Sequence, residues 1–168
     1  ANRGTSMHGH LEKWLAEGSF KAGSNLVHQQ SSRMADAIIK EYLEPNLDEW
    51  WGSEVGLFYP ELYAGTTDCV GVHAGEPSIM DFKQTNRPKK REYIGDYFLQ
   101  LAAYAQAHNN THGTNIQKGV ILMACQPKLL EDGTYTTPEY LEFEVSGEEF
   151  DHWTNEWTKR VELYYLTA

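Results

Sequence analysis

The sequence predicts an α/β fold with a central mixed β-sheet flanked by helices. Apolar residues recur at helical spacing in four segments, and short apolar runs punctuated by Gly and Pro lie between these segments. A mixed sheet with helices on its faces is the simplest way to bury all of these apolar side chains. At 168 residues the chain suits one core and is short for two ordinary domains with a linker. We therefore expect residues 1–168 to form a single domain.

Two helices are expected before the first strand. Gly4-Thr5-Ser6 is expected to cap the first helix, which would place His8 in its first turn. An apolar stripe along this helix is formed by Met7, Leu11, Trp14 and Leu15. The second helix is expected over residues 27–42, before Pro45-Asn46. Its inward face is formed by Met34, Ala37, Ile38 and Tyr42.

Three strands and one helix are expected in the middle of the chain. Apolar runs over residues 55–59, 64–72 and 78–82 predict a β-meander, with a turn at Gly75-Glu76. The segment 93–108 predicts an amphipathic helix that ends at Asn109-Asn110. Its apolar positions are Tyr97, Leu101, Tyr104 and Ala105.

A hairpin and a final helix are expected to complete the fold. Residues 119–125 are apolar throughout, which is typical of a strand buried on both faces. A turn centred on Gly133 and a strand over residues 140–145 should follow. Ser146-x-x-Glu149 is a capping box that opens the last helix. The apolar face of this helix is formed by Phe150, Trp153, Trp157 and Val161.

The net charge of −10 argues, taken alone, against nucleic acid as a partner, because phosphate binding is normally driven by Lys and Arg. Two facts soften this objection. Metal-binding carboxylates count as negative in the sum yet are neutralised when loaded, and the basic residues are unevenly placed. Five of the 14 lie within nine positions: Lys83, Arg87, Lys89, Lys90 and Arg91.

Membrane spans, leader sequences and cysteine usage bear on the cellular location. No stretch approaches the ~18 apolar residues of a membrane span. The chain opens on Ala1 without a basic-then-apolar leader and without an initiator methionine, so we expect that a native N-terminal segment has been removed. Cys69 and Cys125 fall in apolar runs, where a reduced thiol behaves as a small hydrophobe. These features favour the cytoplasm and no disulfide.

Two carboxylates are expected to converge on the sheet. Hydrolysis of a phosphodiester near neutral pH needs a held phosphate, stabilised oxygen charge and a nucleophilic water, which Mg²⁺ on carboxylates supplies. Asp68 and Asp81 lie on neighbouring predicted strands across the Gly75 turn. Asp81 and Lys83 alternate with Phe82, so they project to one face. There Lys83 could orient and deprotonate the attacking water or stabilise the transition state.

The order of these motifs resembles the PD-(D/E)xK nuclease superfamily, which implies a restriction-endonuclease-like core. The residues that carry the resemblance are Gly65-Thr66-Thr67-Asp68, Ile79-Met80-Asp81-Phe82-Lys83 and Gln100-x-x-x-Tyr104. More narrowly, Arg3-Gly4-Thr5-Ser6-Met7-His8 followed by Glu12 is similar to the upstream helix of the RecB-type branch. Thr67 stands where the superfamily name has proline, an absence common in this branch.

The resemblance implies a role for each matched residue. The metal, Mg²⁺ or Mn²⁺ as one or two ions, would be bound by His8, Asp68, Asp81 and the backbone carbonyl of Phe82. Lys83 would be catalytic, together with Glu54, for which Glu61 is the alternative. Gln100 and Tyr104 lie four residues apart on one helical face and would contact phosphate or support the ligands. Arg87, Lys89, Lys90 and Arg91 follow Lys83 directly and are expected to contact phosphate.

Three functions from different classes remain open. The first is a metal-dependent deoxyribonuclease, an exonuclease that prefers single-stranded DNA, as in DNA repair, recombination or phage systems. The second is a non-catalytic nucleic-acid-binding or recombination-partner module that retains the fold. The third is an acidic domain that binds protein by mimicking DNA charge. A zinc site at His108 and His112 is rejected because the helix is expected to end between them. Trp50 or Trp51 could stack on a base.

Overall fold

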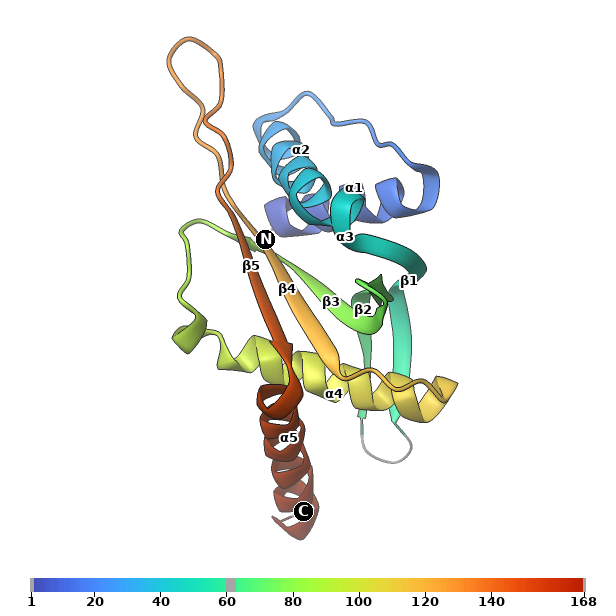
Figure 1. Ribbon diagram of the computed structural model, residues 1–168. Helices are drawn as coiled ribbons and strands as arrows, with labels where there is room; N and C mark the ends of the chain where they lie inside the picture. Colours follow the sequence, from blue (N-terminus) through green and yellow to red (C-terminus); the bar gives the residue numbers. More distant parts are fainter. Residues whose placement is uncertain (1, 60–62, 168) are drawn as a thin grey trace. The chain divides into compact units, whose positions relative to one another are not determined.

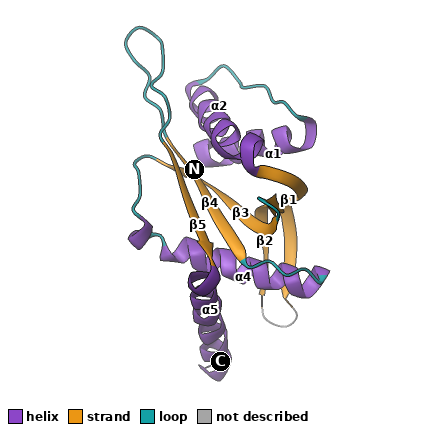
Figure 2. Ribbon diagram, in the orientation of Figure 1, coloured by secondary structure: helices purple, strands orange, loops and turns teal. Residues whose placement is uncertain are grey.

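The computed structural model describes residues 2–59 and 63–167, and the side chains of residues 3–52 and 69–166. It contains a mixed five-stranded sheet in the order β1-β2-β3-β4-β5, together with helices, as predicted (Figure 2). The strands are β1 (Leu47–Tyr59), β2 (Tyr63–His73), β3 (Glu76–Thr85), β4 (Lys118–Cys125) and β5 (Tyr140–Ser146). The main helices are α1 (Asn2–Glu17), α2 (Leu26–Ile38), α4 (Gly95–His112) and α5 (Gly147–Thr167).

The chain divides into two compact units. Unit 1 comprises Ala1–Leu47, Phe82–Lys89 and Leu122–Glu142, whereas unit 2 comprises Asp48–Asp81, Lys90–Ile121 and Phe143–Ala168. Strands β1, β3, β4 and β5 contribute residues to both units. Within the described parts of the chain, no helix is long and apolar enough to cross a membrane.

In unit 1, α2 packs beside α1 (Figure 1). The apolar stripe of α1 is confirmed at Met7 and Leu11, which are fully buried. The cap expected at Gly4-Thr5-Ser6 is wrong, because these residues lie inside a helix that begins at Asn2. The Ser6 hydroxyl instead accepts a hydrogen bond from Ser31 on α2, at 2.7 Å. His8 therefore lies beyond the first turn.

The second predicted helix is divided in the structure. α2 ends at Ile38 and continues as a π-helical turn, η1 (Ile39–Leu43), and then as a short helix, α3 (Glu44–Asn46). The extra residue in the π turn rotates the following side chains, so that adjacent Tyr42 and Leu43 are both buried. Ala37, predicted to face inward, is half-buried, and Ala35 is the buried alanine.

In unit 2, α4 packs against α5 (Figure 1). The ring of Trp153 on α5 lies so close to Gly95, the first residue of α4, that a Cβ there would lie 2.8 Å from it. The predicted end of α4 at Asn109-Asn110 is wrong. The helix continues to His112 and is capped by Gly113 in the left-handed conformation, with φ of 67°.

The predicted strands are present, but β1 begins at Leu47, eight residues before the predicted start. All eight residues of β4 are buried, which confirms a strand covered on both faces. Beyond β4, the chain forms the predicted turn at Gly133 and returns as β5 (Figure 2). β2 and β3 pair antiparallel, with Cys69 opposite Met80. Cys69 and Cys125 are both buried free thiols.

Candidate active site

β3 carries the Asp81-Phe82-Lys83 triplet at its centre. Phe82 is 2% exposed and belongs to the core, whereas Lys83 is half-buried. Because side chains alternate along a strand, Asp81 and Lys83 share the face opposite to Phe82. Asp81 is only 8% exposed. Burial of a carboxylate is costly unless hydrogen bonds, ion pairs or a bound cation compensate it.

His8 reaches the same triplet from α1, across 74 residues of sequence. Its Nε2 lies 2.6 Å from the carbonyl oxygen of Phe82. The ring centroids of the two residues are 6.0 Å apart. Since a carbonyl oxygen only accepts, the contact requires the proton of the imidazole on Nε2. Two of the four predicted metal-binding groups are therefore brought together within unit 1.

A chain of hydrogen bonds in unit 1 holds α1, and with it His8, in place. The guanidinium Nε of Arg3 on α1 donates to Oε1 of Gln30 on α2 at 2.6 Å, and Nε2 of Gln30 donates to the Pro127 carbonyl at 3.0 Å. Next to Pro127, the backbone N–H of Gln126 donates to the Thr85 carbonyl at the end of β3, at 2.9 Å. The buried Gln30 was missed by the sequence analysis, since a single glutamine in an amphipathic helix carries no local signal.

Asp68, Glu54 and Glu61 have side chains outside the described residues. The backbone of Asp68 lies in β2, and the antiparallel register is described as far as the pair Cys69 and Met80. Asp68 directly precedes Cys69, and Asp81 directly follows Met80. Among the side chains that the structure describes, no three or more His, Cys, Asp or Glu residues form a metal-binding group.

Gln100 and Tyr104 are adjacent on α4 in unit 2, as their spacing predicted. The Gln100 amide donates to the Tyr104 hydroxyl at 3.2 Å, and both side chains are half-buried. A side-chain amide and a phenol each contain both hydrogen-bond donors and acceptors. The pair can thus act as one polar unit.

The four basic residues after Lys83 differ in their surroundings. Arg87, Lys89 and Lys90 are exposed. Arg91 forms an ion pair with Glu149 on α5 and donates to the Glu144 carbonyl at 2.8 Å. Its positive charge is therefore largely satisfied within unit 2.

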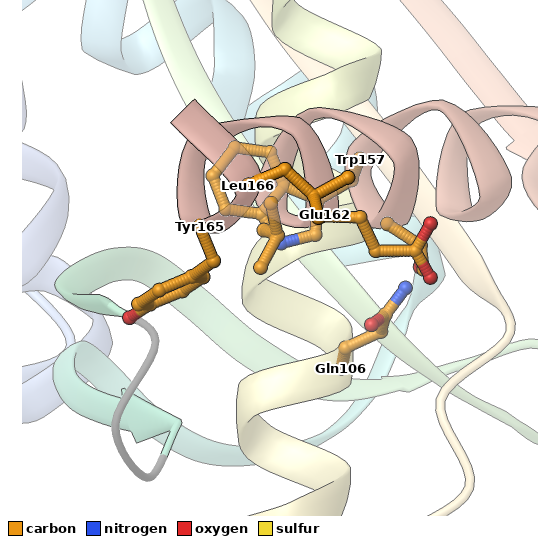
Figure 3. Close-up of a pocket in the computed structure, with 7 residues that line it drawn as sticks. Gln106, Trp157, Glu162, Tyr165 and Leu166 are labelled. Atoms are coloured by element: carbon orange, nitrogen blue, oxygen red, sulfur yellow. The ribbon is translucent and has the colours of Figure 1, made fainter. Parts of the chain in front are cut away.

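The cavity between α4 and α5 contains none of the predicted site residues (Figure 3). Its volume is about 620 Å³, and Gln106 of α4 faces Trp157 and Glu162 of α5 across it. The cavity is therefore separate from the residues predicted to carry chemistry.

α4 does not end between His108 and His112, contrary to the prediction, although the described residues supply no third ligand for a zinc ion. Both histidines lie on α4, with ring centroids 4.4 Å apart. Nδ1 of His108 lies 2.7 Å from the Thr114 hydroxyl, which itself donates to Oδ1 of Asn109. Burial and the nearby His112 charge lower the pKa of His108 below 6.5. The buried imidazole is thus part of the structure that ends α4.

The fold resembles a solved bacterial structure. A candidate exonuclease from Eubacterium rectale superposes with a TM-score of 0.62 and 14% sequence identity, covering 96% of this chain and 64% of that chain. At this identity the likeness shows the fold alone. No protein-family model matches the sequence.

Sequence relatives give a more particular relationship. Mitochondrial genome maintenance exonuclease 1 of Xenopus tropicalis is 30% identical over 117 residues, which are 66% of this chain and 30% of that protein. The human protein of the same name is 30% identical over 107 residues, 61% of this chain and 28% of that protein. The chain thus spans less than a third of the length of these relatives. The similarity supports a relationship to the RecB-type nucleases.

Proposed function

We propose that this chain is a metal-dependent nuclease that hydrolyses phosphodiester bonds in DNA. The observation that carries the proposal is the 2.6 Å approach of His8 Nε2 to the Phe82 carbonyl oxygen. This contact joins the upstream helix motif to the Asp81-Phe82-Lys83 triplet, as a shared cation would require. The names of the sequence relatives, both exonucleases, agree with it.

The donor set suits Mn²⁺ as well as Mg²⁺. His8, Asp68, Asp81 and the Phe82 carbonyl would bind the cation, which gives one imidazole nitrogen among oxygen donors. Both cations favour oxygen ligands, which three of the four donor groups supply. A bound cation would act as a Lewis acid on the scissile phosphate. To bind a cation through Nε2, His8 would carry its proton on Nδ1 and would give up its hydrogen bond to Phe82.

Lys83 and the α4 pair would act on the reacting groups. Lys83 would orient the attacking water and take up its proton, or donate hydrogen bonds to the phosphate oxygens as negative charge develops. Glu54 would be a second proton acceptor near the water. Gln100 and Tyr104 would hold phosphate or orient the ligands, and Arg87, Lys89 and Lys90 would bind flanking phosphates.

The finer proposal is an exonuclease with preference for single-stranded DNA. The exonuclease activity rests on the RecB-type resemblance and on the names of the relatives, and the strand preference on the resemblance alone. The proposed cytoplasmic location rests on the buried free thiols, whereas the relatives are named for mitochondria. A non-catalytic nucleic-acid-binding or recombination-partner module is the second candidate. The approach of His8 to the triplet favours the nuclease, because a binding module has no need of convergent ligands.

Degradation of end-labelled and circular DNA tests these proposals. Single-stranded, double-stranded and covalently closed substrates would be incubated with Mg²⁺, Mn²⁺ or EDTA. We expect metal-dependent loss of linear single strands, with circles spared. Cleavage of circles would contradict the exonuclease, and cleavage in EDTA would contradict metal dependence. DNA binding without cleavage under any metal would favour the binding module.

A further inference from the structure

We propose that Tyr93 stacks on an unpaired base of a single-stranded nucleic acid held by the basic residues before it. The inference rests on the proposed function and names a residue that would distinguish single-stranded from double-stranded substrate. Tyr93 is 78% exposed, the second-largest exposed fraction among the large apolar residues that the structure describes. It ends the 3₁₀ turn η2 (Arg91–Tyr93), and only Ile94 separates it from α4.

The backbone on both sides of Tyr93 is fixed. Its amide donates to the Lys90 carbonyl at 3.0 Å, and the Ile94 amide donates to the Arg91 carbonyl at 3.2 Å. The Ile94 side chain is 2% exposed and anchors the turn in the core. The exposed ring therefore projects from a rigid turn rather than from a loose loop, so little entropy is lost when a ligand binds it.

Arg91 supplies the second anchor. Besides its bonds to Glu149 and the Glu144 carbonyl, its guanidinium lies 4.8 Å from the ring centroid of Phe98 on α4. These contacts, all within unit 2, hold the first residue of η2 in place. The buried Ile94 holds the other end of the turn. Arg91 is thus a positioning residue for the turn, although its charge was expected to contact phosphate.

The residues around Tyr93 favour nucleic acid as the partner. Arg87, Lys89 and Lys90 precede it by three to six positions, and all are exposed. Cations that follow a phosphate backbone, combined with an aromatic ring that stacks on bases, are how proteins bind single strands without reading sequence. A duplex hides the faces of its bases, so the ring adds affinity only where a base is unpaired. A protein surface is the other possible partner for an exposed ring.

Binding of a fluorescent oligothymidylate, followed by anisotropy in EDTA to prevent metal-dependent cleavage, tests the inference. We expect Tyr93→Ala to weaken binding about five- to a hundredfold, the range for loss of one base–aromatic stack. Tyr93→Phe keeps the stacking ring and should bind within about twofold of the unaltered chain. Tyr164→Ala removes another exposed tyrosine, on α5, and should leave binding unchanged.

An oligonucleotide of abasic sites separates stacking from charge. It retains the phosphates but has no bases, so Tyr93→Ala should have no effect on its binding. An equal loss on both oligonucleotides, or no loss on oligothymidylate, would overturn the stacking role while leaving the nuclease proposal intact. In the latter case a protein contact would become the better account of the exposed ring. Failure of the unaltered chain to bind any DNA, with or without Ca²⁺, would count against both proposals.

Discussion

Unit 1 contains nine Lys or Arg residues and nine Asp or Glu residues, whereas unit 2 contains five and fifteen. The whole net charge of −10 therefore belongs to unit 2, and unit 1 is neutral. Unit 1 also contains His8, Lys83, Arg87 and Lys89. Three of the proposed phosphate-binding cations, Lys83, Arg87 and Lys89, therefore lie where acidic residues are balanced, whereas Lys90 lies in the acidic unit 2. A net charge averaged over the chain hides this difference and is a weak argument against nucleic acid.

The largest effect is expected at Lys83 in unit 1. Lys83→Ala should lower the cleavage rate about a hundredfold to ten-thousandfold, the range for loss of a general acid–base group. Lys40→Ala removes an exposed lysine of the same unit that pairs with Asp36, and should cleave normally. Initial rates on a labelled linear strand measure both. Equal losses in the two variants would show that charge in unit 1, rather than a specific lysine, supports cleavage.

One amide side chain in each unit joins separate parts of the chain by hydrogen bonds. Gln30 in unit 1 joins Arg3 to Pro127, and Asn109 in unit 2 accepts from the Thr114 hydroxyl and bonds both backbone polar groups of Ile116. Gln30→Ala and Asn109→Ala should each lower the free energy of unfolding by about 1–3 kcal/mol, because each substitution leaves polar groups without their hydrogen-bond partner.

Only Gln30→Ala should also slow cleavage, because Gln30 holds the helix that bears His8. Urea denaturation would give the stability, and cleavage rates would be measured where both variants are fully folded. Slower cleavage by Asn109→Ala to the same degree would break the distinction between the units.

A smaller effect is expected for the exposed lysines. Lys89→Gln in unit 1 should reduce the slope of log affinity against log salt by about 0.7–0.9, the contribution of one phosphate contact. Lys159→Gln on α5 in unit 2 is a matched control, since Lys159 is exposed and its partner is Glu156. Anisotropy titrations of DNA over a range of salt concentrations measure both slopes. A change of slope for Lys159→Gln alone would place the phosphate contact on α5 rather than at Lys89.

The smallest effect is a pH dependence shared by both units. Burial is the main cause that lowers the pKa of His10 in unit 1 and of His108 in unit 2. As the pH falls below the unfolded value of about 6.5, the unfolded chain takes up protons that the folded chain resists. The free energy of unfolding should therefore decline as the pH drops through 6.5 and level off below the lowered values.

Amide substitutions separate the two histidines. His10→Gln and His108→Asn retain a hydrogen-bonding group near Nε2 and Nδ1 respectively but do not titrate. Each substitution should reduce part of the decline in the free energy of unfolding, measured by urea denaturation from pH 7.5 to 5. An unchanged slope in His108→Asn would show that unit 2 does not contribute to it.

Elements with local signals could be predicted, and elements fixed by distant contacts could not. β4 was predicted because a strand buried on both faces is apolar at nearly every position. The continuation of α4 to His112 was missed because Asn109 uses its side chain to bind Ile116 and Thr114, and Gly113 caps the helix. The π turn after α2 was missed because no local pattern marks it.

The same division holds for the candidate site. The order and spacing of His8, Asp81 and Lys83 could be recognised in the sequence. The resemblance grouped His8 with the Phe82 carbonyl as metal ligands, but the direct hydrogen bond between them could not be predicted from spacing, since any residue at position 82 supplies that oxygen. Arg91 was grouped with the phosphate ligands because its neighbours in sequence are basic, whereas its partners Glu144 and Glu149 lie more than fifty residues away.

The most direct test is a calorimetric titration of Mn²⁺ into the intact chain, His8→Ala and Asp81→Asn, with Asp132→Asn in the distant β4–β5 turn as control. If His8 and Asp81 bind one cation, both substitutions should weaken Mn²⁺ binding by at least about tenfold, with Asp132→Asn unchanged. Mn²⁺ binding of equal strength in the intact chain and in both site variants would contradict the proposed metal centre.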